Sequence, residues 1–237
     1  MKYCYSVIVA MVPLLLSRAG KLLPLSAFTW LWYTINMVEI ELKAHVQDVA
    51  DLVSRLASFA QFQRCCYKSD TYWKEPHKQV QIRIREEKNF FTEASCFHAE
   101  QWPLKTEDFP ADCSSQLLVT YKRKELMKNS FEVNQEQEFQ VDKREPLELF
   151  LQDTGFAIHL KKEKLVAAWQ WDKVLLELCF IPELGNFLEL EILCQSQAPQ
   201  VVSSAHQRLR QVLFACGIEE AAIEGRYYSQ LLQEVRS

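Results

Sequence analysis

Charged and apolar side chains alternate along several short segments of this chain. In residues 38–44, acidic and basic groups occupy one parity and apolar groups occupy the other. Successive side chains of a β-strand point to opposite faces, so this segment is predicted to form a strand with one ionic and one apolar face. Its ionic positions are Glu39, Glu41 and Lys43. On its own, this pattern is typical of a strand whose charged face is exposed to water.

The same alternation recurs in strand after strand, which makes simple exposure a poor explanation. The later ionic positions are Arg83, Arg85, Lys122, Lys124, Glu132, Glu136, Glu138, Lys162, Lys164, Glu177, Glu189 and Glu191. If these strands close into a barrel, their ionic faces meet inside it. The lumen must then hold water and ions of both signs, because like charges in a dry interior are too costly. Carboxylates suit hard cations such as Mg²⁺ or Mn²⁺, and arginine and lysine suit phosphate oxygens, so the pattern predicts a site for a metal-bound polyphosphate.

The wider periodicity predicts an α+β fold, a closed antiparallel β-barrel of about eight strands with helices packed outside. Strands are expected at about 38–44, 62–73, 80–86, 117–124, 131–141, 156–164, 166–171, 174–180 and 187–194. Apolar residues at three- and four-residue spacing predict helices at about 48–60, 146–155, 203–216 and 227–235. Residues 88–115 have no clear period and are interpreted as a long loop insertion, either a lid over the lumen or a surface excursion.

The composition agrees with a soluble globular domain and argues against some partners. The 237 residues are 49% hydrophobic and 24% charged. The net charge of −4 gives no basic surplus to displace counterions, so nucleic acid is not expected as a partner. The 8 cysteines form no C-x-x-C pair, which indicates a reducing, cytoplasmic compartment rather than a disulfide or zinc framework. A homodimer is compatible with this composition.

The first 36 residues differ from the rest of the chain. Lys2 precedes an apolar stretch at 3–16, and a second apolar stretch covers 22–33. The first stretch has the basic start and the length of a signal-peptide core, but it is short for a membrane span. We interpret residues 1–36 as a translated upstream extension, with Met37 as the native start and 37–237 as the functional domain. A membrane anchor is the first alternative and export is the second.

The ordered charged motifs resemble those of the CYTH, or triphosphate tunnel metalloenzyme, superfamily. The segment Glu39-x-Glu41-x-Lys43 matches its E-x-E-x-K signature. The resemblance continues through Asp70-Thr71-Tyr72, Arg83-Ile84-Arg85, Thr120-Tyr121-Lys122-Arg123-Lys124, Glu136-x-Glu138, Gly155-Phe156, Lys162-x-Lys164 and the run from Leu184 to Glu191. The closing segment Tyr228–Leu232 is similar to the end of the class IV adenylyl cyclase branch. The ordered series spans roughly residues 37 to 232.

This resemblance implies a role for each matching residue. Glu39, Glu41 and Glu189 are expected to bind Mg²⁺ or Mn²⁺. The residues Glu136, Glu138 and Glu191 are expected either to bind a second metal or to hold the cations in place. The expected triphosphate-binding residues are Lys43, Arg83, Arg85, Lys122, Lys124, Lys162 and Lys164. Of these, Lys43, Arg83, Arg85 and Lys124 are expected to take part in catalysis.

One departure from the family pattern bears on the reaction. Cys179 stands where class IV cyclases are expected to carry an aspartate, and Glu177 lies two positions earlier on the same strand face. Glu177 is therefore included among the expected metal ligands, in place of the missing carboxylate.

Three functions are consistent with the sequence. The leading hypothesis is an adenylyl cyclase-like enzyme that converts ATP to cyclic AMP and pyrophosphate. The second is a triphosphatase that acts on thiamine triphosphate, a nucleotide or inorganic triphosphate. The third is a non-catalytic module that binds a polyphosphate or a nucleotide.

Overall fold

A computed structural model of the chain describes residues 38–77, 80–91, 93, 97–105, 109, 113–125 and 132–236, with backbone only for 91, 122–125 and 132–136. The predicted extension at residues 1–36, and with it the prediction that Met37 is the native start, lies outside the described residues. Within the described part, no helix is long and apolar enough to cross a membrane.

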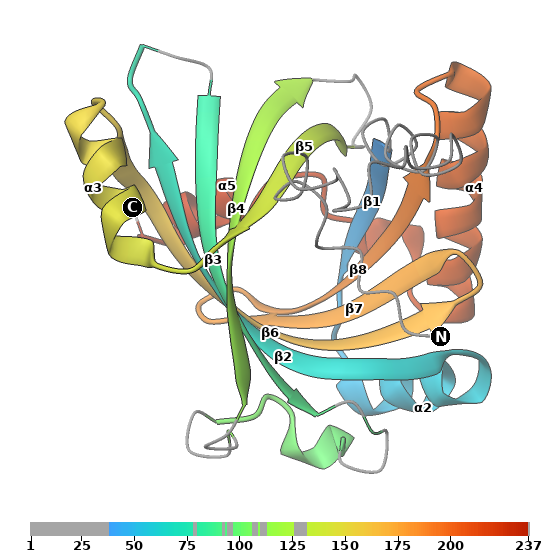
Figure 1. The fold of residues 1–237 in the computed structure, drawn as a ribbon. Coiled ribbons are helices and arrows are strands. Elements are labelled where there is room, and N and C mark those ends of the chain that lie inside the picture. The colour runs from blue at the N-terminus through green and yellow to red at the C-terminus, as the bar shows by residue number, and fades with distance from the viewer. Residues whose placement is uncertain are drawn as a thin grey trace, which may run out of the picture.

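The described chain has an α+β fold with one eight-stranded antiparallel sheet and four α-helices (Figure 1). The strands are β1 (Val38–His45), β2 (Gln61–Lys74), β3 (Val80–Phe91), β4 (Ser114–Glu125), β5 (Glu132–Val141), β6 (Ala157–Trp171), β7 (Val174–Ile181) and β8 (Gly185–Cys194). The helices are α2 (Val49–Phe59), α3 (Arg144–Asp153), α4 (Pro199–Ala215) and α5 (Tyr228–Arg236), with short 3₁₀ turns at Ala99–Gln101 and Glu220–Ala222.

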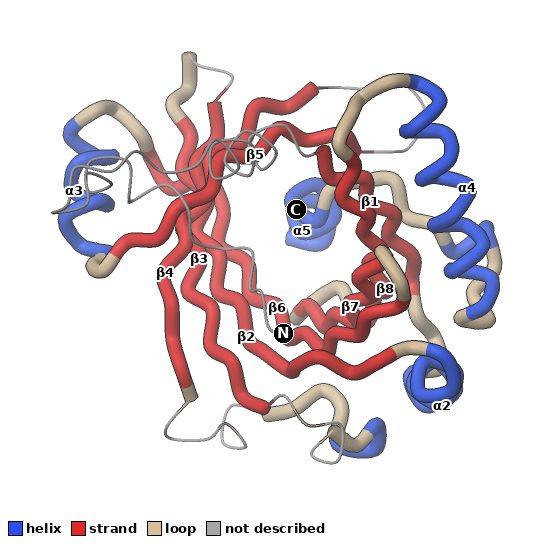
Figure 2. The backbone as a smooth tube through the Cα atoms, turned by 45° about the vertical axis from the view of Figure 1, so that its right-hand side comes forward, coloured by secondary structure: helices blue, strands red, loops and turns tan. Residues whose placement is uncertain are grey.

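The strand pairings run round a complete ring, which we call the barrel. The order is β1-β5-β4-β3-β2-β6-β7-β8, and β8 pairs again with β1. The shortest link is between β1 and β5, where the pairing runs over three residues of each strand, from Glu39–Asn134 to Glu41–Glu132. Figure 2 shows the strands curving round a common axis, with α2 and α4 outside.

The apolar side chains at alternate strand positions point outward and pack against helices. Ile40 and Leu42 of β1 are 0% and 2% exposed, and they belong to a core shared with α2 and α4. That core includes Leu52 and Leu56 of α2 and Leu209 of α4. Burial of these helix faces accounts for the predicted three- and four-residue apolar spacing. The charged residues, which occupy the other alternate positions of the strands, therefore lie on the inner face of the barrel.

Several predicted element boundaries are wrong. The two strands predicted at 156–164 and 166–171 are the single strand β6, which runs from Ala157 to Trp171, because β6 pairs with β2 along nearly its whole length. Strand β3 continues to Phe91, which pairs with Cys65, so the insertion predicted from residue 88 begins later. Helix α4 starts at Pro199, a residue suited to the first helical turn because its backbone nitrogen carries no hydrogen to satisfy.

The described part of the insertion packs against the barrel. Phe97 stacks on Phe62 of β2 at a ring-centroid distance of 5.6 Å. The indole nitrogen of Trp102 donates a hydrogen bond to Oδ1 of Asn186 at 2.9 Å, and its ring packs on Phe97 at 5.9 Å. These contacts fix residues 97 and 102 beside β2 and the start of β8.

Helix α5 covers one end of the barrel, where Figure 2 shows it beyond the ring of strands. Tyr228, Leu231 and Leu232 are 8%, 6% and 1% exposed. They form an apolar cluster with strand residues that include Val166 and Cys179. One end of the barrel is therefore filled by apolar side chains, whereas the ionic residues lie further along the interior.

Candidate active site inside the barrel

The strand register connects the ionic residues across the inner face. Residues paired between adjacent strands lie on the same face, so a series of pairs traces one surface. The pairs are Glu41–Glu191, Lys43–Glu189, Glu177–Glu189, Lys68–Lys164, Asp70–Lys162, Asp70–Arg85, Arg83–Thr120, Thr120–Glu138 and Lys122–Glu136. Three of these pairs join like charges, which repel each other when directly opposed. Groups of opposite charge must therefore lie close to these pairs.

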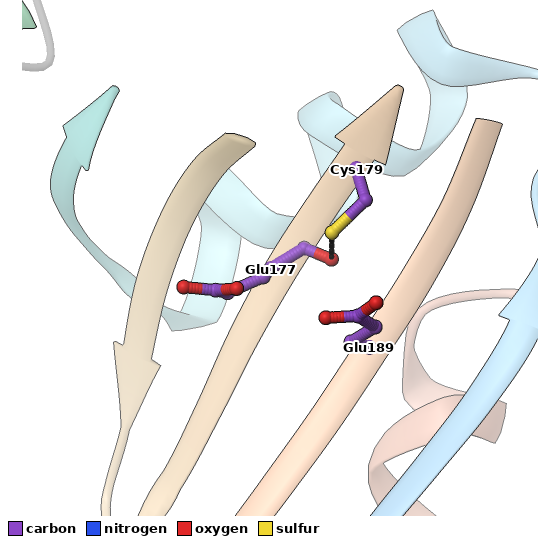
Figure 3. Close-up of side chains that lie close together, drawn as sticks. All are labelled: Glu177, Cys179 and Glu189. Atoms are coloured by element: carbon purple, nitrogen blue, oxygen red, sulfur yellow. Dashed lines mark hydrogen bonds between the residues drawn. The ribbon is translucent and has the colours of Figure 1, made fainter. Parts of the chain in front are cut away.

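A buried cluster of candidate metal ligands lies on β7 and β8. Glu177 and Cys179 come from β7, and Glu189 comes from the neighbouring strand (Figure 3). One ligand atom from each residue lies within 4.8 Å of the others. The thiol of Cys179 donates a hydrogen bond to the backbone carbonyl of Glu177 at 3.4 Å. The structure thus brings together Glu177 and Glu189, two of the expected metal ligands.

Lysines compensate the charge of these two carboxylates. Lys68 Nζ donates to both carboxylate oxygens of Glu177, at 2.9 and 3.0 Å. Lys164 Nζ lies 2.6 Å from Glu189 and 3.6 Å from Glu177. Burial alone would raise the pKa of Glu189, but the ammonium of Lys164 outweighs burial and lowers it to about 2. Burial likewise opposes ionisation of Glu177, and Lys68 holds its pKa below the usual range.

A second group of charges centres on Asp70. Arg85 donates two hydrogen bonds to this carboxylate, at 2.6 and 2.9 Å, and Lys162 Nζ lies 3.4 Å from it. The hydroxyl of Tyr72 donates to the same carboxylate at 3.2 Å. Burial works against the charged form, but Arg85 and Lys162 keep the pKa of Asp70 well below its ordinary value. This carboxylate aligns two cations that were predicted to bind phosphate.

A third group links β3, β4 and β5. Arg83 donates to the hydroxyl of Thr120 at 2.8 Å and lies 3.5 Å from the carboxylate of Glu138. The Thr120 hydroxyl in turn donates to Glu138 at 3.0 Å. Arg83 is 8% exposed, so the guanidinium lies inside the barrel as predicted.

Lys43 contacts the C-terminal segment rather than a carboxylate in the described contacts. Its Nζ donates to the backbone carbonyl of Arg226 at 2.6 Å and lies 4.3 Å from the ring centroid of Tyr228. Lys162 Nζ lies 4.9 Å from the same ring. The α5 region therefore gathers two of the predicted phosphate-binding lysines.

The remaining predicted residues are located by register. Glu39, Glu41 and Glu191 are half-buried, and Glu41 pairs with Glu191 beside the Lys43–Glu189 pair. Lys122, Lys124 and Glu136 occupy positions on β4 and β5 in the predicted strands, and their side chains lie outside the described ones.

Sequence reasoning missed Lys68 as a site residue, and it treated Asp70 only as part of a motif. Both are buried, at 5% and 1% exposure. They could have been found from their spacing: Lys68, Asp70 and Tyr72 occupy alternate positions of β2, so all three side chains point to the inner face. They were missed because the alternation is interrupted by apolar and aromatic residues at neighbouring inner positions.

The donor set fits a hard divalent cation in part. Two close, ionised carboxylates are suitable ligands for Mg²⁺ or Mn²⁺, which complete their coordination with water and phosphate oxygens. Burial raises the pKa of the Cys179 thiol well above its ordinary value, so the thiol is protonated and a poor ligand for such ions. Glu177 and Glu189 would hold the metal, with Glu39 and Glu41 as the neighbouring carboxylates.

Comparisons with known proteins identify the fold. No protein-family model matches this sequence, and no curated protein matches it. Among solved structures, a Pyrococcus horikoshii protein is 22% identical, with a TM-score of 0.65 over 83% of this chain and 98% of that one. A candidate adenylate cyclase from Vibrio parahaemolyticus is 16% identical, with a TM-score of 0.59 over 82% and 97%.

This chain has the fold of the triphosphate tunnel proteins. A further similar structure is a candidate adenylyl cyclase from Hippeastrum with a dominant triphosphatase activity. It is 15% identical, with a TM-score of 0.52 over 84% of this chain and 95% of that one. The fold predicted from the ordered motifs is confirmed by these matches.

Proposed function

We propose that this protein is a divalent-metal-dependent enzyme that cleaves a triphosphate inside the barrel. The observation that carries the proposal is the convergence of acidic and basic side chains on one inner face, with Glu177, Glu189 and Lys164 in direct contact. A barrel interior needs no such charges for stability, because a buried ion pair is often no better than apolar packing. A metal-bound triphosphate would account for both kinds of charge, because the metal binds the acidic side chains and the phosphates bind the basic ones.

The chain's own residues bind and align the substrate in this proposal. Arg83, Arg85 and Lys162 would contact non-bridging phosphate oxygens, arginine with paired donors and lysine with a point charge. Lys164 would move from Glu189 towards the phosphates when a cation occupies the carboxylates. A bound Mg²⁺ or Mn²⁺ would supply positive charge to the phosphate oxygens and increase the acidity of the attacking hydroxyl or water.

Two reactions fit this site, and they differ in the nucleophile. In cyclisation, the reaction favoured by the sequence motifs, the ribose 3′-hydroxyl loses its proton to water or to the leaving group and its oxygen attacks the α-phosphorus of ATP. The bond from the α-phosphorus to the bridging oxygen breaks, and cyclic AMP and pyrophosphate are released. In hydrolysis, water attacks the terminal phosphorus, the bridging P–O bond breaks, and ADP, orthophosphate and a proton are released.

Hydrolysis has the better structural support. Cyclisation requires the ribose, and not just the phosphates, to lie among the ionic residues. One end of the barrel is filled by Tyr228, Leu231 and Leu232, and the described interior beyond them carries the charged groups. This arrangement suits a triphosphate that enters with its terminal phosphate first. Cys179 also stands where the resemblance to class IV cyclases implies an aspartate, so the carboxylate at this point would come from the shifted position Glu177.

Product analysis by ³¹P NMR tests the proposal. Purified protein is incubated with ATP and Mn²⁺, and we expect ADP and orthophosphate; cyclic AMP with pyrophosphate would instead support cyclisation. Glu39→Ala and Glu41→Ala should each abolish turnover and leave the melting temperature close to that of the wild type, because both side chains are only half-buried. Near-normal turnover in both variants would show that Glu39 and Glu41 take no part in the metal site. Absence of turnover with retained binding would favour the non-catalytic module.

A further inference from the structure

The hydroxyl of Tyr228 is a buried polar group that lies near the carboxylate of Glu189 but has no hydrogen bond of good geometry in the described part of the chain. Tyr228 is the first residue of α5 and is 8% exposed. Burial and the nearby carboxylate of Glu189 raise the pKa of this hydroxyl well above its ordinary value, but no group in the described part of the chain accepts a well-formed hydrogen bond from it. Burying a hydroxyl without a hydrogen bond costs free energy, so most buried hydroxyls have a partner. An unpaired hydroxyl inside an ionic interior therefore points to a partner that the chain does not supply.

The surroundings of this ring are cationic. Nζ of Lys43 lies 4.3 Å and Nζ of Lys162 lies 4.9 Å from the ring centroid, and these lysines come from β1 and β6. A cation near an aromatic face is attracted to it, so one ring holds two ammonium groups from separate strands. The edge-to-face contact with Phe187, at 5.1 Å and 82°, keeps the ring in place.

Neither of these two ammonium groups has a carboxylate of its own: both lie near Glu189, Lys43 by strand register and Lys162 by charge, and Glu189 is already paired with Lys164. Lys43 donates to the Arg226 carbonyl, which carries no net charge. Lys162 lies 3.4 Å from Asp70, a carboxylate that already accepts two hydrogen bonds from Arg85. The carboxylates of Glu189 and Glu41 also lie near the hydroxyl. In the proposed function a bound cation occupies Glu189, which leaves the two ammonium groups for the substrate. Phosphate oxygens, which accept hydrogen bonds and carry negative charge, complement both features.

We propose that the Tyr228 hydroxyl donates a hydrogen bond to a non-bridging oxygen of the terminal phosphate, between Lys43 and Lys162. This inference rests on the proposed function and deepens it, because it makes α5 part of the substrate site. The inner end of the site then recognises phosphate alone. Inorganic triphosphate, which has no nucleoside, is accordingly a sufficient ligand for this end.

Calorimetric titration of the full-length protein with inorganic triphosphate tests the role of the hydroxyl. Tyr228→Phe keeps the ring and both cation–ring contacts and removes only the hydroxyl. A hydrogen bond to a charged acceptor is strong enough that its loss should weaken binding by about tenfold or more. Tyr227→Phe is the matched control, since Tyr227 is adjacent and half-buried, and it should bind within about twofold of wild type.

The melting temperature of the ligand-free variant separates a binding role from a structural one. Because the hydroxyl is unpaired in the described structure, Tyr228→Phe should melt at the wild-type temperature or above. Unchanged triphosphate affinity in Tyr228→Phe, with normal binding by the wild type, would overturn this inference and leave the proposed function standing. A loss of affinity with a matching loss of stability would also overturn it. Failure of the wild type to bind triphosphate would overturn both.

Discussion

At the scale of single residues, the site depends on how each buried charge is compensated. Lys164 lies between Glu189 and Glu177, at 2.6 and 3.6 Å, and is 4% exposed. Removing one partner of a buried ion pair leaves an uncompensated charge in a medium that solvates it poorly. The stability of the ligand-free protein should therefore be sensitive to this one ammonium group.

Lys164→Met tests that dependence. We expect the free energy of unfolding, measured by urea denaturation, to fall by about 3–5 kcal/mol, since two carboxylates lose their shared cation. Added Mn²⁺ should restore part of the loss, because a divalent cation takes the place of the ammonium. Lys161→Met is the control: Lys161 is the neighbouring residue on the exposed face and should change stability by less than about 0.5 kcal/mol. Equal effects of the two variants would show that Lys164 is not part of a coupled charge cluster.

At the scale of elements, the sequence predicted most strands and helices but not all of their ends. Periodicity located α2 and the inner and outer faces of β1, since each of those patterns comes from burial against a partner. It could not show that residue 165 continues a strand, because the pairing of β6 with β2 is a long-range interaction. It also did not reveal that α5 closes an end of the barrel, because periodicity shows which face of a helix is buried but not which element packs against that face.

Helix α5 should contribute to stability through the residues that enter the barrel. Leu232 is 1% exposed in the cluster around Tyr228, whereas Val235 of the same helix is 58% exposed. Leu232→Ala should lower the free energy of unfolding by about 2–5 kcal/mol, because it removes buried methyl groups and leaves a cavity. Val235→Ala should change it little. A small effect of Leu232→Ala in urea denaturation would mean that α5 does not pack into the barrel as described.

At the scale of the whole molecule, the interior is an array of opposed charges whose ionisation is tied to folding. The folded pKa of Glu189 is about 2, against an ordinary 4.5, and the pKa values of Glu177 and Asp70 are also lowered. A lowered folded pKa means that the ionised carboxylate stabilises the fold. This stabilisation is fully present above about pH 4.5 and is lost as the pH falls towards 2. We expect the urea midpoint to stay nearly constant from neutral pH to about 5 and to fall steeply below about 4.5; a midpoint unchanged between pH 5 and pH 3 would contradict these ion pairs.

At this scale the inner ionic face was predictable from the sequence, whereas individual ion pairs across the barrel were not. The recurrent alternation predicted an inner ionic face, and the register of the eight strands agrees with it for Glu41, Lys43, Arg83, Lys162 and Glu189. The pairing of Lys68 with Glu177 was not predictable, because 109 residues separate them and only the strand order brings them together. The choice between cyclisation and hydrolysis was open for a similar reason, since it depends on how deeply a ligand enters the barrel.

A crystal structure of the protein with Mn²⁺ and a non-hydrolysable ATP analogue tests the central claim most directly. We expect anomalous scattering from Mn²⁺ within bonding distance of the Glu177 and Glu189 carboxylates. The triphosphate should contact Arg83, Arg85 and Lys162 inside the barrel. Manganese and triphosphate bound on the outer surface, with the Lys164–Glu189 ion pair intact, would contradict the proposed function.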